Sequence, residues 1–431
     1  MKYFIYLNIR GFVGAIVALI FLQSPTNAQQ KNKSRILVCS DIGGTDPDDF
    51  QSFIHLLMYA NDFTIEGLVS SPYGNGRKAD FLRIIDLYEK DFPKLTDHSS
   101  GYPSADSLRQ LCVQGVINEA PFKGYTTATK GSKHIIDCAT KKTNQPLWIL
   151  VWGGIEDLAQ ALHDAPEIKK NIKVYWIGGP NKKWSVNAYA YIAENHPDLW
   201  MIEANATYRG WFMDEDSPEN LKGKVFYKNY IKGKGFMAGD FVNYYNGDLK
   251  MGDTPSLAYL MNGDANDPTG EGWGGSFTPI KRSTRTIFDG NSSISDTVAV
   301  YGVLEWHFKG PELKISPDTP CFIFETGGQK WPGYYLGNGN YAVRYSPKKT
   351  EIGSYITSSN IPALNQQTGQ YVSVNPWPGK QGMHDYQLGK NWYGDKPDRA
   401  LFLGEQQGAK TISKHREFFL LDWAERWEWL K

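Results

Sequence analysis

Cysteine, net charge and long apolar segments are all scarce in this sequence of 431 residues. Lys and Arg together number 46, as do Asp and Glu, so no overall field attracts nucleic acid or an anionic membrane. After residue 22, no apolar run is long enough to span a bilayer. A nucleic-acid polymer as partner and a multi-spanning membrane protein are therefore excluded.

The four cysteines are Cys39, Cys112, Cys138 and Cys321, and their spacing matches no metal-binding motif. Cys39 falls in an apolar run, where we expect a buried thiol. An oxidising compartment outside the cytoplasm would permit a disulfide such as Cys112–Cys138, which the sequence does not establish.

The N-terminus has the pattern of an export signal. Lys2 and Arg10 flank the start of an apolar core at 12–22, and Ala28 precedes an expected cleavage site. We expect residues 1–28 to be removed and the mature protein to be secreted or periplasmic. An uncleaved anchor is the alternative, but the apolar core is shorter than a comfortable membrane span.

The most informative segment is an apolar run that leads into clustered carboxylates, Ile-Leu-Val-Cys-Ser-Asp-Ile-Gly-Gly-Thr-Asp-Pro-Asp-Asp-Phe at 36–50. Four carboxylates at the end of a buried strand are costly unless a cation lies among them. Ca²⁺ tolerates such crowded oxygen ligands better than Mg²⁺. A surface turn, or a helix cap by Asp48 or Asp49, would give the same local string.

Apolar patterning alternates between strands and helices along the first two thirds of the chain. Such units predict a parallel sheet with crossover helices, whose ligands bind beyond the carboxyl ends of the strands. Asp41, Asn75, Trp152 and Gly178 all fall at such ends. The expected strands are 36–40, 63–71, 147–152 and 172–177, and the expected helices are 50–59, 78–88 and 155–162.

Four short motifs follow one another within this region. They are Asp-Ile-Gly-Gly-Thr-Asp-Pro-Asp-Asp at 41–49, Gly-Leu-Val-Ser-Ser-Pro-Tyr-Gly-Asn at 67–75, Gly-Gly-Ile-Glu-Asp-Leu-Ala at 153–159 and Gly-Asp-Thr-Pro-Ser at 252–256. In this order they resemble motifs of the nucleoside hydrolases, in particular of the secreted nucleoside-hydrolase-like branch often labelled cellulose-binding. The resemblance implies an α/β fold with an open, mostly parallel sheet and flanking helices.

The same resemblance implies a bound Ca²⁺. Its ligands would be the side chains of Asp41, Asp49 and Asp253 and the backbone carbonyl of Glu156. Cleavage of a ribosidic bond passes through an oxocarbenium-like state that carboxylates stabilise, and Asp41 would take a proton from a metal-activated water. Without the resemblance, Asp253 also fits the role of a helix cap.

Three further residues are assigned to the sugar by the resemblance. Asp48 and Asn75 would each bind a sugar hydroxyl, and Asn187 would serve in the segment that clamps the sugar in the family. Asn75 also fits the role of a turn residue.

Two departures concern the leaving group. Gly252 stands where many nucleoside hydrolases carry a His that helps to protonate the leaving base, and Ser276 stands where the branch often has Arg. The residues assigned to the metal and the sugar are therefore retained in the sequence, and those assigned to the leaving group are changed. A different O- or N-glycoside fits as well as a nucleoside.

The last third of the chain changes to a β-rich pattern. Short aromatic strands separated by Asn-Gly and Pro-Lys-Lys turns predict an antiparallel sandwich over 297–378. It resembles the immunoglobulin-like (Ig-like) module that precedes the catalytic barrel in some secreted glycoside hydrolases. Its aromatic side chains could stack on sugar rings or fill the core.

Aromatic residues recur at helical spacing over 414–429, which resembles the last helix of the nucleoside-hydrolase-like domain. The sandwich would then be an insertion near the end of the α/β domain. We expect a signal peptide at 1–28, the α/β domain at 34–290, the sandwich at 297–378 and a loop with the closing helix at 379–431, with 392–397 as loop.

We therefore expect an exported, Ca²⁺-dependent glycosidase that hydrolyses an N-ribosidic or related bond in a small glycoside or glycan. A carbohydrate-binding protein without catalysis and an O-glycosidase of glycan degradation are the alternatives. The sequence permits a homo-oligomer.

Overall fold

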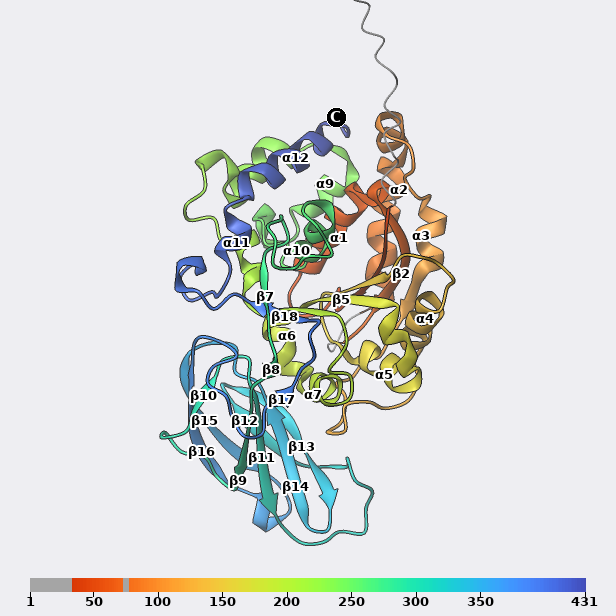
Figure 1. Cartoon of the computed structure of the whole chain (residues 1–431). Coiled ribbons are helices and arrows are strands. Elements are labelled where there is room, and N and C mark those ends of the chain that lie inside the picture. Colours follow the sequence, from red (N-terminus) through yellow and green to blue (C-terminus); the bar gives the residue numbers. More distant parts are fainter. Residues whose placement is uncertain (1–32, 73–76) are drawn as a thin grey trace, which may run out of the picture. The chain divides into compact units, whose positions relative to one another are not determined.

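The predicted first strand is the central element of a mostly parallel sheet (Figure 1). In this computed structural model, which describes residues 33–72 and 77–431, eight strands follow the order β3-β2-β1-β4-β5-β6-β18-β7. All neighbouring pairs described are parallel except β18 and β7. The predicted α/β fold is thus confirmed. The strands are β1 (Ser34–Ser40), β2 (Phe63–Ser70), β3 (Cys112–Gln114), β4 (Leu147–Val151), β5 (Ile172–Ile177), β6 (Met201–Ala204), β7 (Phe277–Pro279) and β18 (Trp392–Asp395).

Helices cover both faces of this sheet because its strands are apolar on both sides. On β1, Ile36 and Val38 join the core under α1, α2, α10 and α12, whereas Leu37 and Cys39 join the core under α4, α5 and α7. No helix within the described residues combines the length and apolar character needed to cross a bilayer. The helices are α1 (Asp48–Met58), α2 (Lys78–His98), α3 (Ala105–Leu111), α4 (Lys130–Ala139), α5 (Glu156–Asp164), α6 (Gly179–Trp184), α7 (Val186–Asn195), α8 (Gly223–Phe226), α9 (Gly235–Phe241), α10 (Thr254–Met261), α11 (Lys410–Ser413) and α12 (Arg416–Glu428).

The order of the strands reverses between β1 and β4. From β1 the chain passes to β2 and β3 on one side of the sheet. It then returns to β4, which pairs with the other side of β1, and continues through β5 and β6. In open α/β sheets, ligands bind beyond the carboxyl ends of the strands at such a reversal.

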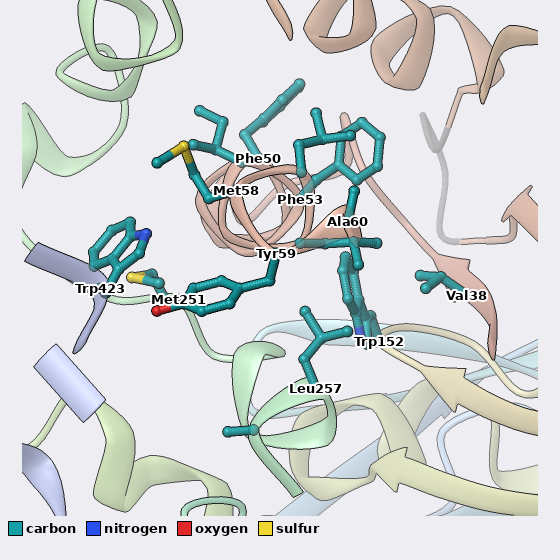
Figure 2. Packing of buried hydrophobic residues seen from close by; sticks show 14 of the residues in the cluster. Val38, Phe50, Phe53, Met58, Tyr59, Ala60, Trp152, Met251, Leu257 and Trp423 are labelled. Atoms are coloured by element: carbon teal, nitrogen blue, oxygen red, sulfur yellow. The ribbon is translucent and has the colours of Figure 1, made fainter. Parts of the chain in front are cut away.

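Large buried side chains pack α1 and α10 against the end of β4 (Figure 2). Phe53, Trp152 and Leu257 are at most 1% exposed, and each such side chain contributes about 1.5–3 kcal/mol by its burial. The Trp152 indole N–H also donates to Oγ of Ser256 at 2.8 Å. The elements that surround the strand reversal between β1 and β4 are therefore held together by close packing.

The inserted region is a sandwich made from one continuous sheet, with the order β10-β16-β15-β12-β13-β14-β11-β9. Trp306 on β11 contacts the rings of Tyr355 on β15 and Tyr371 on β16, with centroids 5.1 and 6.0 Å away. These strands are not neighbours, so the sheet folds over its own aromatic core, as the predicted sandwich requires. The strands are β9 (Arg285–Asp289), β10 (Thr297–Ala299), β11 (Val303–Lys309), β12 (Pro320–Thr326), β13 (Gln329–Gly337), β14 (Asn340–Tyr345), β15 (Glu351–Ser358) and β16 (Thr368–Val374).

The Asn-Gly signal for a hairpin is confirmed between β13 and β14. Asn338 and Gly339 both have positive φ, 51° and 69°, as the type I′ turn of a tight hairpin requires. The apolar run that begins at Val298 is interrupted, since Tyr301 takes φ 58° between β10 and β11.

The prediction of a loop at 392–397 is wrong, because Trp392–Asp395 forms β18 inside the sheet. This strand pairs in parallel with β6 and antiparallel with β7. Both oxygens of the buried Asp395 carboxylate accept main-chain N–H groups, from Ala206 at 2.8 Å and Thr207 at 3.1 Å. A short segment with Gly and a following Pro resembles loop in sequence, and only its pairing partners make it a strand.

The cysteines are free in the structure. Cys112 and Cys138 do not form the disulfide that the sequence permitted, and their thiols lie near the carbonyls of Leu108 and Glu66 instead. Cys39 is buried in β1, as expected. A small two-stranded pairing of β8 (Arg282–Ser283) with β17 (Tyr386–Gln387) completes the described strands. The predicted signal segment, 1–28, lies outside the described residues.

Candidate active site

A cavity of about 320 Å³ opens at the carboxyl ends of β1, β4, β5 and β6. Four predicted site residues line it together: Asp41, Asp48, Asp49 and Asp253. They come from segments about 200 residues apart and meet because the strand reversal and the start of α10 share one edge of the sheet.

Asp41 directly follows β1 and faces the end of β4. A Cβ atom added to Gly153 would lie 2.4 Å from Oδ1 of Asp41, so only glycine allows this approach. The carbonyl of Asp41 also accepts the N–H of Gly44 at 2.8 Å, which fixes the turn after the strand. Asp41 is thereby held at the cavity by the turn after β1 and by its close approach to Gly153 after β4.

Asp48 and Asp49 are the first two residues of α1, whose N-terminal dipole favours negative charge. Asp49 accepts a hydrogen bond from the hydroxyl of Ser40, and Asp48 accepts the N–H of Gly252 at 3.2 Å. Neither carboxylate caps the helix, since Pro47 occupies the N-cap position. Their side chains are therefore available to the cavity.

Asp253 occupies the N-cap position of α10 but makes no side-chain capping bond there. Its N–H donates to Oγ of Ser52 at 3.3 Å, and its Oδ2 is buried without a hydrogen-bond partner among the described residues. One carboxylate oxygen each from Asp48, Asp49 and Asp253 lies within 4.8 Å of the others. The cap interpretation of Asp253 is therefore wrong, and its orphaned oxygen points to a missing positive partner.

Gln51 on α1 holds the segment that leads to Asp253. Its side-chain oxygen accepts the N–H groups of Lys250 and Met251 at 2.9 and 3.1 Å. Its amide donates to the carbonyl of Asp248 at 2.7 Å. The two distant acidic segments are thus joined by direct hydrogen bonds.

Burial and mutual repulsion raise the pKa values of all four carboxyl groups. For Asp41, Asp49 and Asp253 the pKa lies well above its usual range, first because of burial and then because of the neighbouring carboxylates. Burial and the charge of Asp46 raise the pKa of Asp48 to about 7. Crowded buried carboxylates with one unpartnered oxygen match the donor set of a hard divalent cation.

Two predicted site residues, Glu156 and Asn187, are not among those that line the cavity. Glu156 is the first residue of α5; its carboxylate accepts a hydrogen bond from Oγ of Ser185 at 2.7 Å, and burial raises its pKa to about 8. A contribution of its backbone carbonyl stays a prediction. Asn187 on α7 donates to the carbonyl of Ala120 at 3.0 Å. Asn75 lies outside the described residues.

Sequence reasoning missed the other side chains that line the cavity. Asn181, Lys183 and Trp184 come from α6. Tyr208 and Arg209 come from the 3-10 turn Thr207–Trp211 after β6. The available signal was the strand β5 ending in Gly-Gly, which marks the same sheet edge. Gln329 and Lys348 of the sandwich also line the cavity, and no local signal marked them.

Comparison with known protein families identifies the α/β part. The family model described as "Cellulose-binding Sde182, nucleoside hydrolase-like domain" matches residues 35–277. The chain belongs to this family. The resemblance that the four motifs predicted is confirmed for the Sde182 nucleoside-hydrolase-like family. A second family model, for a domain of unknown function (DUF5060), matches residues 297–360.

Several solved structures are similar to the chain. A nucleoside hydrolase-related protein from Saccharophagus degradans, described as associated with carbohydrate metabolism, is 16% identical, with 79% of this chain and 99% of that chain covered and a TM-score of 0.49. The inosine-uridine preferring nucleoside hydrolase from Bacillus anthracis is 17% identical, with 59% and 87% covered and a TM-score of 0.34. The purine-preferring ribonucleoside hydrolase from Gardnerella vaginalis is 16% identical, with 58% and 84% covered and a TM-score of 0.31. No curated protein matches the sequence significantly.

Proposed function

We propose that this chain is an exported hydrolase of glycosidic bonds that works with a bound Ca²⁺. The observation that carries the proposal is the buried Oδ2 of Asp253, which has no hydrogen-bond partner among the described residues and lies in a cavity that Asp41, Asp48 and Asp49 also line. Membership of a nucleoside-hydrolase-like family supports glycoside chemistry. Export rests on the signal pattern of the first 28 residues.

Asp41, Asp49 and Asp253 are the proposed side-chain ligands, and the main chain of Glu156 is the proposed fourth. Asp48 has an oxygen in the same cluster as those of Asp49 and Asp253, so it contributes to the field around the ion. A bound Ca²⁺ would keep these carboxylates ionised, bind sugar hydroxyls and lower the pKa of a water.

Each step of the hydrolysis is then assigned to residues of this chain. Asp41 accepts the proton of the water that attacks the anomeric carbon. Asp48, with Oδ2 held by the N–H of Gly252, accepts a sugar hydroxyl at its other oxygen. The carboxylates stabilise the positive charge that develops on the sugar ring. Trp152 and Tyr208 give the cavity apolar walls that limit access of bulk water.

The test is release of free sugar from nucleosides and from plant and bacterial glycans, with Ca²⁺ and with EDTA. We expect activity that EDTA abolishes and that Asp41→Asn lowers by about 10²–10⁴-fold, the usual share of a general base. Asp106→Asn, on the exposed side of α3, is the matched control and should keep full activity. Activity that is unaffected by EDTA would contradict the proposal.

A second function, carbohydrate binding without hydrolysis, is favoured by one observation. Gly252 offers no side chain to protonate a leaving group, and the family description names cellulose binding. In that case no glycoside would release sugar, although sugar binding would still depend on Ca²⁺. An O-glycosidase would instead release sugar from glycans and not from nucleosides.

A further inference from the structure

Three cations line the same cavity as the carboxylates: Lys183 on α6, Arg209 after β6 and Lys348 after β14. Among the described residues, no carboxylate lies within ion-pairing distance of any of the three. Lys250 differs, since it forms an ion pair with Asp46 and lies 4.0 Å from Asp48. Lys250 therefore belongs to the acidic cluster, and the other three form a separate group, which we call the cationic group.

The three charges line one cavity and act on one another. Burial and the charge of Lys348 lower the pKa of Lys183 to about 8. Burial and the charge of Arg209 lower the pKa of Lys348 in turn, while Glu351, which is paired with Lys349, offsets this only in part. Like charges that converge on a cavity are unfavourable unless an anion enters between them.

The side chains of Lys183 and Arg209 are held in position by contacts with uncharged side chains, whereas Lys348 is exposed. Lys183 is only 3% exposed and donates to the side-chain oxygen of Gln329 on β13. Its carbonyl accepts the indole N–H of Trp331 at 3.3 Å. Arg209 lies over the ring of Tyr208, 5.2 Å from its centroid, and its side chain hydrogen-bonds Tyr301, while its Nε is buried with no hydrogen-bond partner among the described residues. Lys183 and Arg209 are therefore built features of the cavity, which the exposed Lys348 also lines.

We propose that the ligand of this cavity is an anionic sugar, whose carboxylate, sulfate or phosphate binds Lys183, Arg209 and Lys348 while its hydroxyls face the acidic cluster. This inference rests on the proposed function, because it assigns the substrate class of the same site. A guanidinium and two ammonium groups match the oxygens of such an anion with charge-assisted hydrogen bonds. The cavity volume lies within the range of small-ligand sites.

The inserted sandwich then has a defined role in specificity. Gln329 and Lys348 are its contributions to the cavity, and Gln329 also positions Lys183. The α/β part would hold the sugar ring, and the sandwich would help to select its charged substituent.

Calorimetric titration with a series that differs only at C6 tests this inference. The probes are glucose, glucuronate, glucose 6-sulfate and glucose 6-phosphate, with the galactose series in parallel, each in the presence of Ca²⁺. We expect at least one anionic member to bind ten-fold or more tightly than the neutral sugar, and its identity distinguishes carboxylate, sulfate and phosphate. The preference should weaken as salt is raised.

Two neighbouring lysines provide matched variants. Lys348→Gln should lower the preference for the anion about five-fold or more, whereas Lys349→Gln, whose lysine pairs with Glu351, should keep it. Equal binding of neutral and anionic sugars, or equal behaviour of the two variants, would overturn the inference.

The proposed hydrolysis can fail separately from this inference. An anion preference without release of sugar from any glycoside removes the hydrolase and keeps the anion site. Release of sugar without an anion preference keeps the hydrolase and removes the anion site.

Discussion

The main-chain N–H of Gly252 donates to Oδ2 of Asp48, and a Cβ atom at position 252 would lie 2.3 Å from that same oxygen. Position 252 is where many nucleoside hydrolases carry a His. In this chain, any side chain there would displace the Asp48 carboxylate. The position of the Asp48 carboxylate in this chain is therefore compatible with Gly at position 252 and not with His.

Gly252→Ala should move the Asp48 carboxylate and weaken cation binding without unfolding the chain. We expect the dissociation constant for Ca²⁺ to rise about ten-fold, or roughly 1.4 kcal/mol, in calorimetric titration. Gly239→Ala is the control, because this exposed helical glycine has open space around its Cβ position. If both variants bind Ca²⁺ as tightly as the wild type, the close contact at Gly252 is unimportant.

Asp253→Asn should show separately how much the buried charges destabilise the metal-free protein and how much they contribute to Ca²⁺ binding. In EDTA the variant should melt at a higher temperature than the wild type, because one of four mutually repelling carboxylates is gone. With Ca²⁺ at 100 times its dissociation constant, the wild type should gain about 2.7 kcal/mol and the variant much less. Thermal unfolding with and without Ca²⁺ checks both parts, and a variant stabilised by Ca²⁺ as strongly as the wild type would contradict the ligand role.

Stability without metal should fall as pH rises from about 4 to about 8. The pKa of Asp48 is raised from 3.8 to about 7 and that of Glu156 from 4.5 to about 8, both chiefly by burial. The folded state therefore holds protons in this window that the unfolded state has released, so the unfolding free energy decreases with pH. Chemical denaturation at pH 5 and pH 8 in EDTA measures the decrease.

Ca²⁺ should reduce this pH dependence, because the cation stabilises the ionised carboxylates. Glu156→Gln should remove the part due to that residue. A stability in EDTA that rises steadily from pH 5 to pH 8 would show that other groups dominate.

Lys182→Met should be strongly destabilising. Lys182 and Glu203 form an ion pair at 2.6 Å with both side chains fully buried, and Tyr189 and Trp392 also donate to Glu203. Removal of one partner leaves a buried charge, which costs about 3–5 kcal/mol, as urea denaturation can measure. The control is Lys169→Met in the half-exposed pair with Asp198, where we expect less than about 1 kcal/mol. Similar losses in the two variants would count against this account.

The acidic half of the site could be predicted because it follows from local sequence and sheet geometry. Asp41, Asp48 and Asp49 come directly after a recognisable buried strand, and parallel strands bring their carboxyl ends to one edge. Asp253 could be assigned only through the family motif, since its local string reads equally well as a helix cap.

The cationic half could not be predicted. Lys348 reaches the cavity because the sandwich packs against α6, where the rings of Trp184 and Trp331 stack with centroids 5.0 Å apart. Nothing in the sequence near Lys348 encodes that packing. Asn187 lies on α7, beyond the end of the short helix α6, and Asn181 is the asparagine of this region that lines the cavity.

The position of β18 has a consequence for how the chain is made. During synthesis β6 emerges long before its partner Trp392–Asp395, and the whole sandwich is translated in between. One border of the nascent sheet therefore stays open and able to pair wrongly until the last segment arrives. The sandwich, a continuous stretch with its own aromatic core, can form first, so a segment translated after it completes the sheet that begins with β1.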